Sequence, residues 1–221
     1  MATRQIVTIY ILTFIKIIIS KANMCRLWLL VLLLSFLLSP SWATTVVPPD
    51  FTTMVKRAEI IFSGQVTDVR SQWLGEGSQR CIVTKVSLTV LKTLKGSASS
   101  PYVLQTLGGT VDNRTMEVDG VPQFKVGDRT LLFVEHNGTQ ICPLVGFMHG
   151  YFRIATDTKS SQEIILRYNG EPLRSTTEID QIHQQAVASS GTQLETSEIV
   201  GPPMKRADFE AEIQRKVSAG L

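Results

Sequence analysis

The sequence has few of the residues from which metal and redox sites are built. Its 221 residues include three cysteines and three histidines, namely Cys25, Cys81, Cys142, His136, His149 and His183. No histidine has a partner at the short spacing that metal sites use, and two isolated cysteines without neighbouring histidines make a poor zinc site. We therefore expect no metal ion and no other cofactor.

Motifs of known enzyme classes are also absent. The chain contains no Gly-x-Ser-x-Gly, His-Glu-x-x-His, Cys-x-x-Cys, Walker or EF-hand motif. His149 is the best single candidate for a site, because it lies beside Gly150 in the same predicted set of strands as Asp128 and Glu135. An exposed turn histidine is the simpler interpretation, since the sequence shows no partner that would perturb its titration. The sequence thus predicts no catalytic residue.

The charge pattern gives no case for a nucleic-acid partner. The whole chain has 22 basic and 19 acidic residues, and the first 43 residues contain four of the basic ones and no acid, which leaves 18 basic residues against 19 acidic ones. No run of five or six like charges occurs in the remainder. A nearly neutral chain lacks the basic surface that phosphate backbones attract.

Residues 24–43 have the pattern of a secretory signal peptide. Arg26 precedes an apolar run from Leu27 to Leu38, and Pro40 and Ser41-Trp42-Ala43 follow it. This order of a basic, an apolar and a small-residue region predicts cleavage between Ala43 and Thr44. The alternative, a membrane anchor, needs about 20 apolar residues. We expect an exported protein, periplasmic or extracellular, that meets the membrane only transiently through its signal peptide.

Residues 1–23 contain a second apolar run, Ile6 to Ile19, interrupted by Lys16. Two export signals in series are redundant, whereas Met24-Cys25-Arg26 is a conventional signal-peptide start. We hypothesise that Met24 is the initiator and that residues 1–23 are a mis-assigned extension. The alternative is a membrane-attached form that keeps both apolar runs. A precursor whose mass includes residues 1–23 would disprove the first hypothesis.

Once the leader is removed, Cys81 and Cys142 remain. In an oxidising compartment two cysteines most simply form one disulfide, so we predict a Cys81–Cys142 bridge. The alternative is a pair of buried free thiols.

The longest regular pattern predicts two β-strands within residues 60–96. Apolar and polar residues alternate on both sides of a Gly/Ser-rich loop, and the face that carries Phe62 and Val66 is the more apolar. We expect that face to be the core face and Gly64 to mark a bulge. Residues 129–136 have a continuous apolar middle, which is typical of a strand buried on both faces.

Shorter elements complete the predicted fold. Further strands are expected at 101–107, 110–118, 140–147 (after an Asn137-Gly138 hairpin), 151–156 and 163–168, and helices at 51–57 (capped by Asp50), 177–187 and 207–217, with a linker at 189–203. Many short strands with Gly/Pro turns favour a mainly β fold, a small closed or partly open OB-like barrel of about 5–8 strands with short flanking helices. The β-barrel domain would span residues 44–174, and a helical and linker segment would span 175–221.

Three segments carry a resemblance to known proteins: residues 58–66 (AEIIFSGQV), Leu94-Lys95-Gly96 and residues 124–133 (FKVGDRTLLF). In these segments the chain resembles uncharacterised exported bacterial proteins and, in outline, the netrin-like modules that include the tissue inhibitors of metalloproteinases. The resemblance implies an OB-type barrel. Those inhibitors use a Cys-x-Cys amino terminus against the protease zinc, whereas this chain would begin at Thr44, so the resemblance does not carry that mechanism over.

These observations favour an exported, non-enzymatic module that binds a protein or an envelope macromolecule. The grounds are the predicted export, the neutral charge, the β pattern and the lack of catalytic spacing. Two alternatives stay open: an exported hydrolase with an unrecognised site, and a structural component of the envelope.

Overall fold

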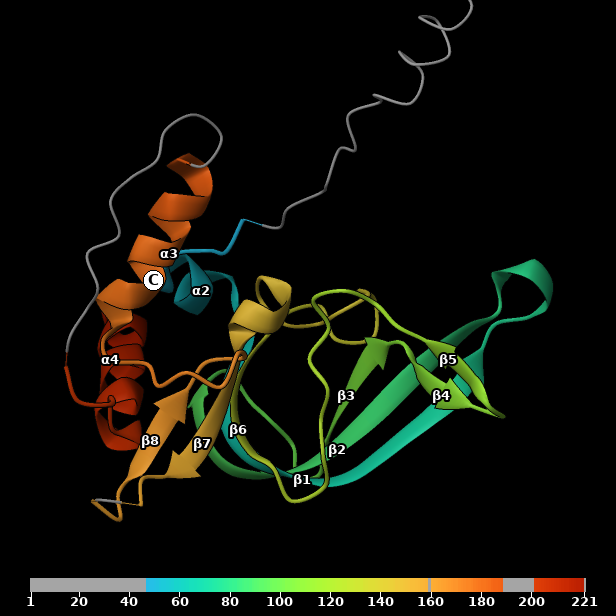
Figure 1. The fold of residues 1–221 in the computed structure, drawn as a ribbon, viewed down its shortest axis with the longest axis horizontal. Helices are drawn as coiled ribbons and strands as arrows, with labels where there is room; N and C mark the ends of the chain where they lie inside the picture. Colours follow the sequence, from blue (N-terminus) through green and yellow to red (C-terminus); the bar gives the residue numbers. More distant parts are fainter. Residues whose placement is uncertain (1–46, 159, 189–200, 221) are drawn as a thin grey trace, which may run out of the picture. The chain divides into compact units, whose positions relative to one another are not determined.

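The computed structural model describes residues 47–158, 160–188 and 201–220, and these described residues belong to one compact unit. The predicted leader, its Ala43–Thr44 cleavage site and most of the predicted 189–203 linker lie outside the described residues. Eight strands and three α-helices are assigned in the described part, so the prediction of a mainly β fold with flanking helices is confirmed (Figure 1).

Six strands form one antiparallel sheet in the order β3-β2-β1-β6-β7-β8. These strands are β1 (Ile60–Leu74), β2 (Cys81–Lys95), β3 (Tyr102–Leu107), β6 (Arg129–Val134), β7 (Tyr151–Thr156) and β8 (Glu163–Leu166). A separate hairpin consists of β4 (Gly109–Val111) and β5 (Arg114–Met116), and it contacts β1 and β2. The predicted long hairpin over 60–96 is therefore confirmed as β1 and β2, joined through the short 3-10 helix η1 (Gly77–Gln79).

The sheet does not close into a barrel, so the closed form of the predicted barrel is wrong. The reason lies at the two edges, whose backbone groups bond to loops. On β3 the Leu107 N–H donates to Ile141 O at 2.7 Å. On β8 the Ile165 N–H donates to Met204 O at 3.0 Å, and Ile165 O accepts from the Leu173 N–H at 2.9 Å.

Two hydrophobic clusters lie against the sheet, and β1 and β6 contribute to both. Ile61 and Phe133 belong to one cluster, whereas Phe62 and Leu132 belong to the other. Because neighbouring residues of a strand point to opposite faces, the first half of β1 is buried on both sides. The expected core face, which carries Phe62 and Val66, is buried, and the opposite face is a core face as well, since Ile61 is equally buried. The expected two-sided burial of β6 is confirmed.

The β-bulge predicted at Gly64 is present. The pairing of β1 with β2 shifts register between Ser63 and Gly64. A Cβ on Gly64 would lie 3.0 Å from Thr89 O and 3.1 Å from a ring carbon of Phe62. Only glycine leaves room for this approach of the two strands.

Three helices gather beside β7 and β8 (Figure 1). They are α2 (Phe51–Arg57), α3 (Thr176–Ala188) and α4 (Arg206–Ser218), close to the predicted ranges. Asp50 caps α2 as predicted, accepting from the Thr53 N–H at 2.9 Å. The expected apolar stripe of α4 is buried, with Phe209 and Ile213 in the same cluster as Phe51.

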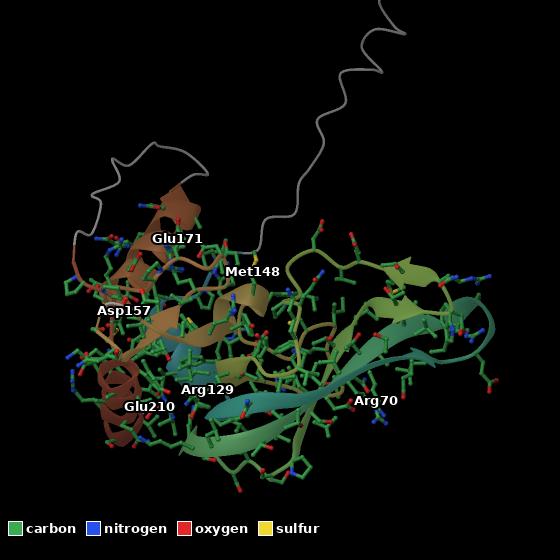
Figure 2. All side chains as sticks on the ribbon, turned by 60° about the horizontal axis from the view of Figure 1, so that its bottom comes forward. Arg70, Arg129, Met148, Asp157, Glu171 and Glu210 are labelled. Atoms are coloured by element: carbon green, nitrogen blue, oxygen red, sulfur yellow. The ribbon has the colours of Figure 1, made fainter. Side chains whose placement is uncertain are left out.

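Ion pairs hold α4 to the sheet in addition to this apolar contact. Arg206 donates to Glu163 at 2.9 Å and to Glu210 at 2.6 Å, and Glu163 also pairs with Arg129. Figure 2 shows Arg129 and Glu210 on the same side of the molecule. The hydrogen bond from Arg129, followed by that from Arg206, lowers the pKa of Glu163. Helix α4 is thus part of the folded unit.

The predicted Asn137-Gly138 hairpin is wrong, because residues 140–147 form no strand. The Asn137 side chain bonds to the edge of β3: its Nδ2 donates to Val103 O at 2.7 Å, and its Oδ1 accepts from the Gln105 N–H at 3.0 Å. The chain beyond it bonds to β3 through Ile141, forms an isolated bridge to β6 at Leu144, and then forms the 3-10 helix η2 (Phe147–Gly150).

Candidate functional site

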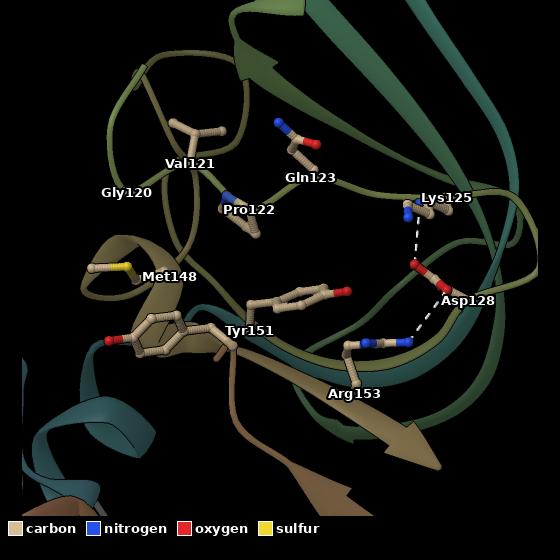
Figure 3. Close-up of a pocket in the computed structure, with 10 residues that line it drawn as sticks. Gly120, Val121, Pro122, Gln123, Lys125, Asp128, Met148, Tyr151 and Arg153 are labelled. Carbon is tan, nitrogen blue, oxygen red and sulfur yellow. Dashed lines mark hydrogen bonds and ion pairs between the residues drawn. The ribbon is translucent and has the colours of Figure 1, made fainter. Parts of the chain in front are cut away.

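One depression that contains the buried Tyr151 lies between β7 and the loop before β6 (Figure 3). We call it the Tyr151 cleft. It has a volume of about 370 Å³ and is lined by Gly120, Val121, Pro122, Gln123, Lys125, Asp128, Met148, Tyr151, Arg153 and Tyr168. Residues 120–125 form one wall, and Tyr151 and Arg153 of β7 form the other.

The loop wall is fixed to β1 by a tight turn at Gly127-Asp128, as the sequence predicts. The Val66 N–H donates to Asp128 O, and the Gly127 N–H donates to Val66 O, both at 2.8 Å. Gly127 has φ +94°, a backbone conformation that favours glycine. The turn presents the Asp128 carboxylate to the cleft, where one of its oxygens accepts from the Lys125 N–H at 3.1 Å.

Tyr151 is held at the floor by packing on both sides of the cleft. The ring of Phe124, a buried loop residue, meets the Tyr151 ring edge to face at 5.2 Å between centroids. The preceding Gly150 has no room for a side chain, because a Cβ there would lie 2.7 Å from Val145 O. The short helix η2 therefore delivers Tyr151 in one position.

The hydroxyl group of Tyr151 points toward Asp128 and Arg153 (Figure 3). It makes no hydrogen bond to any described residue, although the side chain is almost fully buried. Burial, and then the charge of Asp128, raise the pKa of Tyr151 to about 12, against a smaller opposite effect of Arg153. The hydroxyl is therefore protonated at neutral pH, and it is a free donor inside the cleft.

Asp128 and Arg153 form a loose pair at the rim. Their nearest side-chain atoms, Arg153 Nη2 and Asp128 Oδ1, are 4.0 Å apart, and the arginine is about half exposed. A pair this long and this exposed contributes little to stability. Both groups can therefore turn toward a ligand at small cost.

A smaller cavity adjoins the cleft and shares Tyr151 and Tyr168 with it. We call it the His149 cavity. Its volume is about 110 Å³, and it is lined by Pro48, His149, Tyr151, Phe152, Arg167, Tyr168, Ile179 and Ile182. The His149 ring meets Tyr168 edge to face at 5.2 Å between centroids. Burial, and then the charge of Arg167, lower the pKa of His149, so its imidazole is neutral at pH 7.

Arg167 has a buried nitrogen without a partner. Its Nη2 pairs with Glu171 and, at 3.3 Å, with Glu178. Its Nε is buried and makes no hydrogen bond within the part of the chain that the structure describes. Unsatisfied buried donors are rare in native proteins.

A third, polar groove meets the Tyr151 cleft at residues 120–123. It has a volume of about 530 Å³ and runs between the β4–β5 hairpin and β3. Hydroxyl side chains line much of it, from Ser71, Thr84, Thr106, Thr110 and Thr115. The two depressions together offer an extended surface with both polar and apolar side chains.

The structure brings together only part of the predicted His149 grouping. Asp128 lies in the Tyr151 cleft, next to the cavity that contains His149. Glu135 belongs elsewhere, because it is buried and accepts from Arg57 at 2.6 Å. The other histidines also have separate partners: His136 pairs with Glu59, and His183 bonds to Pro48 O. Among the described residues, no group of three or more His, Cys, Asp or Glu side chains is placed to hold a metal ion.

The predicted Cys81–Cys142 disulfide is not present, and both residues are free thiols. Cys142 is buried in the same cluster as Phe62 and Leu144, whereas Cys81 is partly exposed at the first position of β2. One sulfur thus packs within the core while the other sits at the end of a strand. Burial raises the pKa of Cys142 to about 11.

The sequence did not identify Tyr151, Arg153, Arg167 or Tyr168 as site residues. For each of them the sequence predicts only a place in a strand. The available signal was an aromatic residue next to a glycine turn, which occurs at Gly150-Tyr151 and at Tyr168-Asn169-Gly170. That signal does not predict that Tyr151 and Tyr168 line the same cleft.

Comparison with known proteins does not assign the chain to a family. No model of a protein family matches it, and no curated protein matches it either. The structure adds one finding on membranes: none of the helices within the described ranges is long and apolar enough to cross a bilayer.

Proposed function

We propose that this protein is an exported, non-enzymatic binding module, and that the Tyr151 cleft is where a protein or another envelope macromolecule docks. The observation that carries the proposal is the free hydroxyl of Tyr151, an almost fully buried side chain at the floor of the cleft. A concave site with a few converging polar groups and a perturbed pKa is the usual form of a binding site. Tyrosine and arginine are also enriched where protein interfaces derive most of their energy.

The continuity of the cleft with the polar groove supports a macromolecular partner. The two depressions share residues 120–123, so a ligand that fills both is much longer than a small metabolite. Export to the periplasm or the medium is supported by the signal pattern of residues 24–43, and the neutral charge of the remainder argues against nucleic acid.

We also propose that the sheet is a partly open, OB-like barrel related to netrin-like modules. The long first strand pairs with β2 on one side and with β6 on the other. The loop at Ile141 lies between the edge of β3 and the end of β6, through Leu107 N to Ile141 O and the Val134–Leu144 bridge. The loop therefore connects β3 to β6, while the two edge strands of the sheet, β3 and β8, do not pair with each other.

Affinity capture with matched variants tests the binding proposal. The wild-type protein and Tyr151→Phe would be used as bait in the exported fraction of the native cells, with bound species identified by mass spectrometry. Loss of one neutral hydrogen bond weakens binding by about 2- to 10-fold. Arg153→Ala should weaken retention of the same species, whereas Arg215→Ala on the exposed side of α4 should not. Equal retention by all four proteins would refute the role of the cleft.

An exported hydrolase is the second candidate, favoured by the half-buried, neutral imidazole of His149 in its cavity. A neutral imidazole is competent as a general base. Hydrolysis of ester and peptide substrates by the wild type, abolished in His149→Ala, would replace the binding proposal with this one.

A further inference from the structure

An acceptor and a donor face each other at the rim of the Tyr151 cleft without bonding to each other. Arg153 Nη2 and Asp128 Oδ1 are 4.0 Å apart, which is too far for a direct hydrogen bond. Asp128 Oδ2 already accepts from the Lys125 N–H at 3.1 Å, so Oδ1 is the carboxylate oxygen that remains for a ligand. The half-exposed Arg153 makes no hydrogen bond to a described residue.

The Tyr151 hydroxyl is open to the cleft beside this pair. Among the described residues, two buried side-chain atoms without a hydrogen bond are closed to solvent, Thr130 Oγ1 and Arg167 Nε. The Tyr151 hydroxyl also lacks a partner in the described chain but is not closed off in this way, so a ligand can reach it. It points toward Asp128 and Arg153 (Figure 3). One ligand can therefore contact all three side chains.

A hydroxyl group of a ligand matches the Asp128–Arg153 pair, because a single hydroxyl oxygen both donates and accepts. With usual hydrogen-bond lengths of about 2.9 Å to Arg153 Nη2 and about 2.7 Å to Asp128 Oδ1, an oxygen between atoms 4.0 Å apart forms an angle of about 90° with them. Both bonds can form at that angle. A carboxylate oxygen in the same place would face the Asp128 carboxylate, and an ammonium group would face the guanidinium, so either charge is repelled by one partner.

The charges along the two joined depressions also favour a neutral ligand. The lining contains two basic and three acidic residues: Lys125, Arg153 and Asp128 in the cleft, and Glu117 and Asp119 in the polar groove. A ligand with one sign of charge along its length would meet like charges in one depression or the other. A neutral ligand with many hydroxyl groups can instead donate to the carboxylates and accept from the cations.

The dimensions fit a chain of sugar rings. An apolar cavity of about 150 Å³ holds one benzene of six non-hydrogen atoms. By proportion, the 370 Å³ cleft holds roughly 15 such atoms, enough for one hexose ring with its hydroxyl groups. The polar groove continues from residues 120–123 with a further 530 Å³ for neighbouring rings. Tyr168, 42% exposed, adds an aromatic surface in the cleft for the C–H face of a sugar.

We propose that the ligand of the Tyr151 cleft is a neutral glycan. One ring hydroxyl bridges Arg153 and Asp128, and a neighbouring hydroxyl accepts from Tyr151. This inference rests on the proposed function, since it names the class of macromolecule that docks in the same cleft.

A panel of neutral tetrasaccharides tests the proposal: tetramers of glucose, mannose, galactose and N-acetylglucosamine, each in α and β linkage. Binding to the purified protein would be measured by calorimetric titration, and NMR would follow the ring signals of Tyr151 and the guanidinium signals of Arg153. At least one tetramer should bind saturably with a Kd of about 0.1–5 mM, because each new hydrogen bond replaces one to water. The uronate and 2-amino analogues of that tetramer, which carry negative and positive charges, should bind more weakly by about tenfold.

Asp128→Asn is the informative variant. Its amide oxygen can still accept from the Lys125 N–H, but its NH₂ group then replaces the Oδ1 acceptor by a donor. Affinity should fall by about tenfold or more, the loss expected for a hydrogen bond to a charged group. Tyr151→Phe should weaken the same tetramer by about 2- to 10-fold. Asp208→Asn is the matched control, because Asp208 is exposed on α4 and does not line the cleft.

Three results would overturn the proposal: no saturable binding of any tetramer, tighter binding of either charged analogue, or unchanged affinity in both Asp128→Asn and Tyr151→Phe. The proposed function fails by a different result, equal retention of all species in the capture experiment. A protein that is captured by the wild type and lost with Tyr151→Phe, while no tetramer binds, would overturn the glycan and leave the docking cleft in place.

Discussion

Phe209 should be among the most costly residues to truncate in this protein. It lies on α4, is 0% exposed, and belongs to the cluster that lies against β1 and β6. Its ring centroid is 5.7 Å from that of Phe51, 6.3 Å from Phe133 and 5.0 Å from Phe152. Phe209→Ala would remove the ring that joins α2, α4 and two strands.

The size of the effect follows from this burial. Truncation of a buried phenylalanine to alanine costs about 3–5 kcal/mol of unfolding free energy, including the cavity that it leaves. Domains have only about 5–15 kcal/mol in total. For a chain of this length each kcal/mol shifts Tm by about 2–4 °C, so Phe209→Ala should lower Tm by roughly 6–20 °C.

Thermal unfolding followed by circular dichroism and by calorimetry would measure this shift. Arg215→Ala is the control on the same helix, because Arg215 is 69% exposed and pairs with the neighbouring Glu212. Such a surface change usually alters stability by less than about 0.5 kcal/mol. If Phe209→Ala lowers Tm no more than Arg215→Ala does, α4 is not part of the core, and residues 175–221 are an appended segment after all.

Three further predictions concern single side chains. In the native protein without reductant, a thiol reagent should label Cys81 readily and Cys142 hardly at all, because burial raises the pKa of Cys142 to about 11; denaturation should expose both. Stability should fall as pH decreases below about 6.5, because the folded state lowers the pKa of His149 and the unfolded chain then binds more protons; His149→Phe should remove this part of the pH dependence. Asn137→Asp should cost about 1–3 kcal/mol in denaturant titrations, because the carboxylate cannot donate to Val103 O and leaves that acceptor unsatisfied.

Each of these predictions has a result that contradicts it. Absence of labelling at both cysteines in the denatured, unreduced protein would mean that a disulfide forms after all. A pH dependence between 5 and 7 that is unchanged in His149→Phe would assign it to other groups, since the lowered pKa values of Asp50 and Glu163 place their effect at lower pH. Full stability of Asn137→Asp would show that the β3 edge does not depend on this side chain.

Local sequence patterns predicted most of the secondary structure because local physics decides it. Alternation gave β1 and β2, the Asp50 cap marked the start of α2, and Gly64 marked the bulge. The prediction at Asn137-Gly138 failed because a tertiary contact overrode the turn preference. The Asn137 side chain takes the place of a neighbouring strand at the edge of β3.

The site could not be predicted because no single segment contains it. The Tyr151 cleft joins residues 120–128, η2 with the start of β7, and Tyr168 after β8. These segments meet only after β7 pairs with both β6 and β8. The feature that singles the site out, a tyrosine that is almost fully buried while its hydroxyl has no partner among the described residues, is a property of packing. The sequence shows which residues have polar side-chain groups, but it does not show which of those residues become buried when the chain folds.

The edges of the sheet add a reason to place recognition in the cleft. An exposed edge strand is a common docking site, because a partner can add a strand to its free N–H and C=O groups. Here Gln105 and Leu107 of β3 already donate to the Asn137–Ile141 loop, and Ile165 of β8 donates to Met204. A partner that adds a strand would first have to displace these contacts. The Tyr151 cleft requires no such displacement, since its hydroxyl is free and its ion pair is loose, so recognition through side chains in the cleft is the less costly route.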